Sequence, residues 1–339
     1  MVKTALRQKR TTQQTQLQDI AEQLLHNTED FSLLLATANG FYDFCVEISG
    51  LPESVEAIQL ASGKAISPND AATCIRDFLR TARFLQGLEA AILEAQKRFP
   101  NTPISILYAG CGPFAPLALA MTARFSAEEI HFTLIDIHQQ SLDNAQHLFE
   151  QLELSDYLAN SRCCDATTYE HPADEPLHII VTETMQRALD HEPQVAITRQ
   201  LVPQLCIGGI LVPQNICVEA VLCDLSKEFD FQTTGNPLAL SDAKNRLPLG
   251  NLMALNIETA TSGALLEKTC VQVPQTLDFK GDCMLFTTIT VFGDIKLEAY
   301  ESGITYPMAL YEFGKLSGGE RLAFQYAIGE KPGFQYWQD

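Results

Sequence analysis

The sequence predicts an α/β fold in which a mostly parallel sheet is preceded by helices and followed by an antiparallel β domain. Apolar residues recur at helical spacing in residues 1–100, short apolar strands alternate with helical stretches over 101–213, and helical spacing nearly disappears over 214–339. The chain of 339 residues exceeds the usual length of one domain. We therefore expect an N-terminal helical region, a sheet domain and a β-rich domain with these boundaries.

The N-terminal region predicts two helices. Residues 16–25 carry apolar side chains at helical spacing. Asn69 is a residue type that favours the N-cap position, so a second helix is predicted from about Asp70 to Arg98. Pro100 follows directly and is incompatible with a continuing helix.

The middle region alternates strands and helices. Strands are expected at 104–109, 131–137, 160–164 and 178–182, and helices at 114–125, 140–152 and 194–205. This order is typical of a mostly parallel sheet with helices on both faces.

The region after Pro213 predicts antiparallel strands. Four segments are either apolar or alternate apolar with polar residues, and turns rich in Gly, Pro and Asp separate them. The segments are 216–223, 268–273, 284–292 and 323–328. Short strands of this kind predict a sandwich or a barrel.

Composition excludes several classes of partner. The chain has 23 Lys plus Arg against 42 Asp plus Glu, a net charge of -19. Nucleic acids and anionic membranes need local positive charge, so we expect neither as a partner.

Polar residues 11–18 stand where a signal peptide would be apolar, and the ten cysteines show no zinc-ligand spacing. A cytoplasmic protein with reduced thiols and no metal is the expectation.

Chemistry-bearing residues follow the first three predicted strands in order. Gly110 and Gly112 come after the first strand, where glycines let the backbone approach a ligand near a helix N-terminus. Asp136 closes the second strand and can accept both hydroxyls of a ribose. Asp165 follows the third and can accept an adenine amino group. Each of these residues also has an alternative, purely structural role. The glycines could form a tight turn needed only for packing, and either aspartate could cap a helix or lie in a solvated turn.

This glycine loop with its two acidic residues resembles the class I S-adenosylmethionine-dependent methyltransferases. The resemblance implies a Rossmann-like sheet and S-adenosyl-L-methionine as cofactor. Two positions differ from the family pattern, because Tyr108 stands where an acidic residue is usual and Phe114 replaces the third glycine.

A second resemblance lies around the fourth strand. Glu183 follows the strand and Glu192 comes nine residues later, so the two carboxylates can converge on one cationic group. Glu183, Met185 and Glu192 are similar to the double-glutamate hairpin of the protein arginine methyltransferases. The segment Asp77-x-x-Arg80-Thr81 is similar to that family's helix over the cofactor, which implies that Arg80 binds the methionine carboxylate. A surface arginine is the alternative.

These resemblances imply an N-methyltransferase of the arginine-methyltransferase type with Glu183 and Glu192 as catalytic residues, and with Glu183 also binding the cofactor. They also imply a homodimer. The family's Thr-His-Trp loop should fall near residues 303–307, which contain neither His nor Trp. We therefore favour a guanidine or amine of a small amino-acid-like or specialised-metabolite acceptor over a peptide or protein arginine.

Two other functions remain open from the sequence. The same cofactor-binding site would suit an enzyme that transfers or cyclises the aminocarboxypropyl group of the cofactor. It would also suit a partner protein that binds the cofactor without catalysing a reaction.

Overall fold

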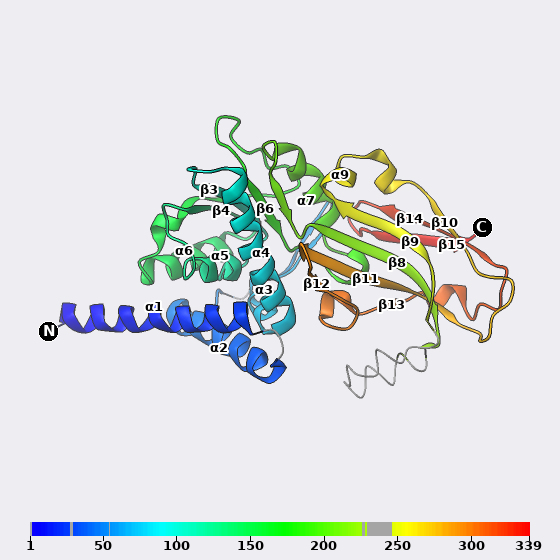
Figure 1. Cartoon of the computed structure of the whole chain (residues 1–339), viewed down its shortest axis with the longest axis horizontal. Coiled ribbons are helices and arrows are strands. Elements are labelled where there is room, and N and C mark those ends of the chain that lie inside the picture. Colours follow the sequence, from blue (N-terminus) through cyan, green and yellow to red (C-terminus); the bar gives the residue numbers. More distant parts are fainter. Residues whose placement is uncertain (1, 28–29, 54, 226–227, 229–245) are drawn as a thin grey trace.

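A parallel sheet with flanking helices is joined to antiparallel strands in the computed structural model of the chain (Figure 1), which describes residues 2–27, 30–53, 55–225, 228 and 246–339. The α/β fold with a Rossmann-like sheet and C-terminal antiparallel strands is thereby confirmed. The division at residues 100 and 213 stays a prediction.

The parallel sheet has the strand order β5-β4-β3-β6-β7. Its members are β3 (Ile104–Ala109), β4 (Ile130–Asp136), β5 (Leu158–Cys163), β6 (Ile179–Thr182) and β7 (Ile210–Val212). All but the edge strand β5 are almost entirely buried, which explains their continuous apolar sequences. The chain runs outward from β3 to β5 and then returns to β6, so the strand order reverses beside β3. Open α/β sheets bind ligands at such a reversal.

Helices cover this sheet. They are α4 (Phe78–Arg98), α5 (Pro116–Met121), α6 (Gln139–Gln151) and α7 (Gln194–Leu201). Of these, α4, α6 and α7 pack against strands, and α5 packs against α4. The inner side of α4 includes Phe84, Leu88 and Ile92, which are fully buried. Burying each of these side chains stabilises the fold by about 2 kcal/mol.

Two helices are shorter than the sequence predicts. The residue before Pro116 is Ala115, whose φ of 41° lies outside the helical region, so α5 starts only at Pro116. At the end of α7 the chain tightens into the 3-10 turn η4 (Val202–Gln204), which contains Pro203. Proline removes the N–H that a continuing α-helix needs.

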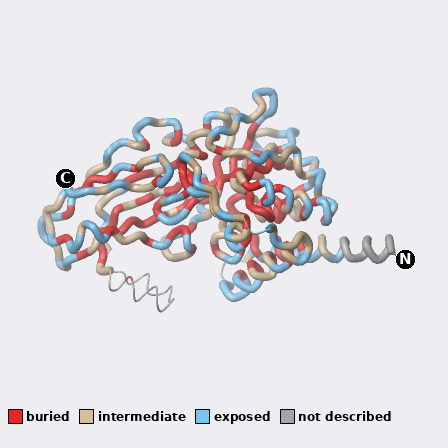
Figure 2. The backbone as a smooth tube through the Cα atoms, turned by 180° about the vertical axis from the view of Figure 1, so that it is seen from behind, coloured by how far each residue is buried: buried red, intermediate tan, exposed pale blue. Residues whose placement is uncertain are grey.

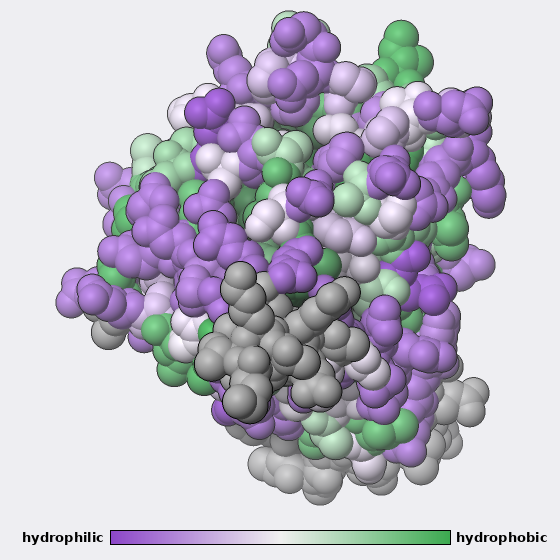
Figure 3. Space-filling model, turned by 90° about the vertical axis from the view of Figure 1, so that its left-hand side faces the viewer, coloured by the Kyte–Doolittle hydropathy of each residue, from purple (hydrophilic) through white to green (hydrophobic). Residues whose placement is uncertain are grey.

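The N-terminal helices α1 (Val2–His26) and α2 (Phe31–Ser49) pack against each other and against α4. The predicted helix at 16–25 is confirmed within α1, and its apolar side chains Leu17, Ala21 and Leu24 are buried. Figure 3 views the molecule from this end, where hydrophilic side chains predominate and hydrophobic ones are scattered. A hairpin of β1 (Ile58–Leu60) and β2 (Gly63–Ala65) follows.

The prediction of one helix from Asp70 to Arg98, capped by Asn69, is wrong. Ser67 caps a short helix α3 (Pro68–Thr73), which tightens into η1 (Cys74–Arg76). Asp77 then breaks the helix with ψ 86° and caps α4. Its second oxygen accepts hydrogen bonds from Ser302 Oγ at 2.6 Å and Gly303 N at 3.1 Å. The break therefore lets one carboxylate cap α4 and bind a C-terminal turn, η7 (Gly303–Thr305).

The C-terminal strands form two antiparallel sheets. One contains β8 (Asn215–Cys223), β9 (Arg246–Asn256), β11 (Asp282–Phe292), β12 (Ile295–Leu297) and β13 (Met308–Ala309); the other contains β10 (Thr269–Gln272), β14 (Arg321–Ala327) and β15 (Gly333–Gln338). The four strands predicted here are confirmed as β8, β10, β11 and β14. Figure 2 shows that buried residues are concentrated in the interior of the molecule and exposed residues in its outer segments. A short helix, α9 (Ile257–Ala260), follows β9.

Because Asp77 joins two distant parts of the chain, we predict that Asp77→Ala lowers the free energy of unfolding by about 2 kcal/mol. Urea denaturation measures this. The matched control is Asp30→Ala, because Asp30 caps α2 at Leu33 N over 3.0 Å and its loss should cost about 1 kcal/mol. Equal costs for the two variants would show that the contact with Ser302 adds no stability.

Candidate active site

One cavity of about 620 Å³ lies at the carboxyl ends of the parallel strands. Its lining includes every residue that the sequence analysis assigns to a site: Arg80, Gly110, Gly112, Asp136, Asp165, Glu183 and Glu192. A cavity of this volume can enclose most of a drug-sized ligand. The structure therefore brings the predicted cofactor residues and the predicted catalytic residues together.

The glycine loop forms the turn after β3. Gly110 and Gly112 have φ of 71° and 64°, a region that favours glycine. A Cβ added at Gly110 would lie 2.3 Å from Thr184 Cγ2, so space also requires glycine there. The Gly110 N–H donates to the Ile135 carbonyl at 2.8 Å. Helix α5 begins with Pro116, which has no N–H, so the first helical residue offers the cavity no donor.

Two aspartates follow β4 and β5 at the cavity wall. Asp136 is 8% exposed and accepts hydrogen bonds from Gly112 N and His138 N, each at 2.9 Å. Burial raises the pKa of Asp136, while these N–H groups oppose the rise. Asp165 accepts from Thr167 N at 2.8 Å and Thr167 Oγ1 at 2.7 Å through one oxygen. Because a carboxylate oxygen can accept two hydrogen bonds, both aspartates retain capacity for a ligand.

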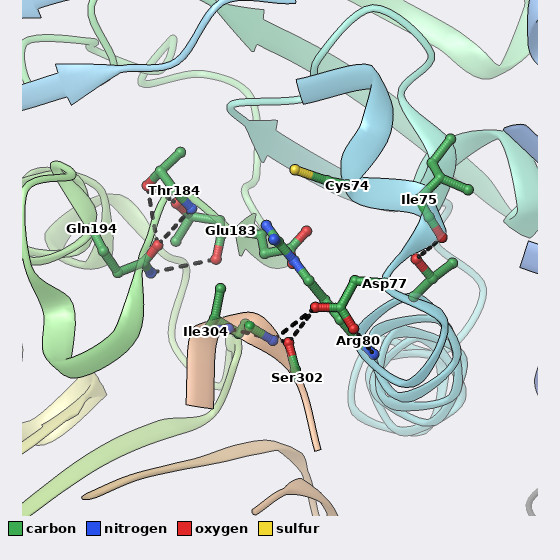
Figure 4. Close-up of polar contacts among 12 residues, drawn as sticks. Cys74, Ile75, Asp77, Arg80, Glu183, Thr184, Gln194, Ser302 and Ile304 are labelled. Atoms are coloured by element: carbon green, nitrogen blue, oxygen red, sulfur yellow. Dashed lines mark hydrogen bonds and ion pairs between the residues drawn. The ribbon is translucent and has the colours of Figure 1, made fainter. Parts of the chain in front are cut away.

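Arg80 and Glu183 form an ion pair at the centre of the site (Figure 4). Arg80 Nε donates to Glu183 Oε1, and the two side chains are 13% and 12% exposed. This exposure excludes the alternative of Arg80 as a surface arginine. Burial raises the pKa of Glu183, and the guanidinium of Arg80 opposes that rise. The bond uses only Nε, so the terminal guanidinium nitrogens can still meet a second carboxylate.

Glu192 lies just before α7 and is 8% exposed. Burial is the main reason that its pKa is raised. The charge of Glu183 raises it further, whereas a hydrogen bond from Gln186 and the charges of Arg80 and Lys64 lower it. Each glutamate thus lies within electrostatic reach of the other and of Arg80.

The loop between Glu183 and Glu192 has an unusual backbone. In this fully described loop, positive φ occurs at Ala188 (54°), Leu189 (58°) and His191 (63°). Ala188 N donates to Thr287 Oγ1 at 3.0 Å, Tyr326 OH donates to the Leu189 carbonyl at 2.7 Å, and His191 N donates to the Pro332 carbonyl at 2.9 Å. Strained backbone persists where its surroundings determine it. The C-terminal strands thus fix the loop that carries both glutamates.

Gln194 is a site-supporting residue that the sequence analysis missed (Figure 4). It is 1% exposed, and its Oε1 accepts from Thr184 N at 2.9 Å and Thr184 Oγ1 at 3.0 Å. Its Nε2 donates to the Thr182 carbonyl and to Thr198 Oγ1, both at 3.3 Å. One buried amide therefore ties the end of β6 to the start of α7. The signal in the sequence was a polar residue on the apolar side of the helix after Glu192.

Two other segments close the cavity. His138 Nε2 donates to the Ile66 carbonyl at 3.0 Å, which holds the chain leading into α3 next to Asp136, the acceptor of the His138 N–H. Gly303 and Ile304 also line the cavity, next to the Asp77–Ser302 contact. This is the turn where the sequence analysis found no His or Trp.

Within the part of the chain that the structure describes, no group of three or more His, Cys, Asp and Glu side chains is arranged to hold a metal ion. No helix in this part of the chain combines the length and apolar composition needed to cross a membrane.

Likeness to known proteins is found in the fold and not in the sequence. No family model matches the sequence, and no curated protein matches it. Among solved structures, the chain is similar to the PRMT1 enzyme-prozyme heterotetrameric complex of Trypanosoma brucei with AdoHcy, with a TM-score of 0.56 and 14% identity over 78% of this chain and 91% of that chain. At this identity the likeness shows a shared fold.

We predict that Gln194→Ala lowers the free energy of unfolding by about 2 to 3 kcal/mol, because it leaves buried partners of the amide unpaired. The Thr184 amide should also exchange with solvent faster. Gln200→Ala on the same helix is the control, since its partly buried Nε2 makes one bond to the Tyr169 carbonyl at 3.0 Å. A cost no larger than that of Gln200→Ala would contradict this role.

The electrostatics of Glu192 give a prediction that needs no substrate. Its carboxyl should titrate above the ordinary value of 4.5, because burial favours the neutral form. The ionised form is then lost at a higher pH than for an exposed glutamate as the solution is acidified. Arg80→Ala should raise this pKa further by removing a cation. Carbon-13 NMR of labelled glutamates measures both, and titration of Glu192 at or below 4.5 would contradict the assignment.

Proposed function

We propose that the protein is an S-adenosylmethionine-dependent N-methyltransferase of the arginine-methyltransferase type. The observation that carries this proposal is the single cavity lined both by a glycine loop with Asp136 and by two buried glutamates. The fold shared with a PRMT1 complex containing AdoHcy supports it.

The residues at the cavity fit S-adenosyl-L-methionine. Asp136 would accept the ribose hydroxyls, and Asp165 the adenine amino group. The loop of Gly110 and Gly112 gives the backbone close approach, and the terminal nitrogens of Arg80 would bind the methionine carboxylate. The bound cofactor supplies an activated methyl group.

Glu183 and Glu192 would bind and orient the acceptor nitrogen. A guanidine or amine entering the cavity meets two carboxylates, which stabilise positive charge and hold the nitrogen in line. Glu183 is already tied to Arg80 and is suited to orientation. Glu192 has a raised pKa without such a direct ion pair, so it is better suited to receive a proton from an amine.

We also propose a cellular compartment and an oligomeric state for the protein. All ten cysteines are free thiols, which fits a reducing compartment such as the cytoplasm. The heterotetrameric assembly of the structural neighbour supports an oligomer, and we propose a homodimer.

Product analysis tests the proposed reaction. The chain is incubated with S-adenosyl-L-methionine and a panel of amino acids, amines and arginine-containing peptides, and products are identified by mass spectrometry. We expect a methylated acceptor and S-adenosylhomocysteine. Methylthioadenosine would instead indicate transfer or cyclisation of the aminocarboxypropyl arm. Cofactor binding without any product would indicate a non-catalytic partner protein.

Two variants separate the roles of the residues. Glu183→Gln should reduce turnover by about 100-fold or more while S-adenosylhomocysteine affinity changes little. Asp136→Ala should weaken cofactor binding by about 2 kcal/mol, because buried partners lose their acceptor. An active Glu183→Gln enzyme, or unchanged binding in Asp136→Ala, would remove the corresponding assignment.

A further inference from the structure

Two cationic side chains of the cavity have no role in the proposed reaction. Lys64 on β2 and Arg187 at the start of η3 (Arg187–Leu189) both line the cavity and are exposed. Neither forms a hydrogen bond or ion pair through its side chain with another described residue. Arg80, by contrast, is paired with Glu183.

Lys64 lies at the end of the cavity where Glu192 is found, and Arg187 lies on the loop that leads to this glutamate. The backbone N–H of Lys64 donates to the His191 carbonyl at 2.8 Å. The charge of the Lys64 side chain lowers the pKa of Glu192. Arg187 directly follows Gln186, whose side chain donates a hydrogen bond to Glu192. The two cations therefore come from separate elements, with Lys64 acting on Glu192 and Arg187 acting on Asp190, two residues before it.

The charges at this end indicate what an acceptor must carry. Arg80 offsets Glu183, and Glu192 would receive the cationic nitrogen of the acceptor. Lys64 then acts on Glu192, and Arg187 on Asp190, only through their charges, because neither side chain forms an ion pair with another described residue. Lysine and arginine in a cavity are well suited to bind a carboxylate, which arginine can hold through two parallel hydrogen bonds. A strongly basic peptide would instead place its neighbouring positive charges against these two side chains.

We propose that the acceptor is a small zwitterion, an amino acid or a related carboxylic acid with a basic nitrogen. Its nitrogen enters between Glu183 and Glu192, and its carboxylate binds Lys64 and Arg187. This inference rests on the proposed methyltransferase function and names the substrate class of that site.

Matched pairs of ligands test the carboxylate subsite. Calorimetry first measures S-adenosylhomocysteine binding and then, on the loaded protein, the binding of L-arginine against agmatine, L-lysine against cadaverine, and L-histidine against histamine. Each pair differs only in the carboxylate. We expect at least one amino acid to bind about tenfold or more tightly than its decarboxylated partner, as charge-assisted hydrogen bonds would give.

Variants locate the effect. In the double variant Lys64→Ala with Arg187→Ala, the affinity ratio between an amino acid and its decarboxylated partner should fall to about one. In Lys64→Glu the amine should bind more tightly than the amino acid. Lys97→Ala is the control, because Lys97 is an exposed residue of α4 that pairs with Glu94 and does not line the cavity. Circular dichroism confirms that each variant is folded.

Several outcomes overturn the inference. It fails if the amines bind as well as the amino acids, if the preference survives in the double variant, or if no amino acid binds to the loaded protein. It also fails if an Arg-Gly repeat peptide binds more tightly than every amino acid, which would favour a protein tail. These failures leave the methyltransferase proposal intact, whereas absence of S-adenosylhomocysteine binding in the first step overturns both.

Discussion

Two carboxylates held inside one cavity are the constraint on which the rest of the structure depends. Moving an ionised carboxylate out of water costs several kcal/mol unless partners offset the loss. Glu183 has Arg80 as its partner, while Glu192 has only Gln186 and more distant cations. Glu192 is thus the less fully compensated of the two charges. A cationic group that binds in the cavity would offset the charge of Glu192. Binding would then recover part of the free energy that burial of this carboxylate costs on folding.

The N-terminal helices, the parallel sheet and the C-terminal strands each contribute to keeping these charges in place. The parallel sheet supplies Glu183 at the end of β6, and the C-terminal strands hold the strained loop through Thr287 and Tyr326. The N-terminal region supplies Arg80 and, through Asp77, binds the turn at Ser302. Contacts that join all three parts give the site rigidity, because loosening any one of them shifts a neighbouring wall of the cavity. The β-rich half therefore supports the site even where it does not line the cavity.

Much of this arrangement could be predicted from local sequence. Buried parallel strands appear as apolar runs, and residues at their carboxyl ends meet at one edge of the sheet, so Gly110, Asp136 and Glu183 were found. The break at Asp77 could not be predicted from the neighbouring residues, because it depends on Ser302, which is 225 residues away. The positive-φ loop could not be predicted for a similar reason, because it depends on hydrogen bonds to Thr287 and Tyr326, which are distant in the sequence. Gln194 differs, because its partners are Thr182, Thr184 and Thr198 and a polar residue on the apolar side of the helix was its signal.

A crystal structure of the chain with S-adenosylhomocysteine tests most directly whether this cavity is the cofactor site. We expect the ribose hydroxyls to lie within hydrogen-bonding distance of Asp136 and the sulfur to face the space between Glu183 and Glu192. A nucleoside bound outside this cavity, or bound with its sulfur turned away from both glutamates, would contradict this expectation.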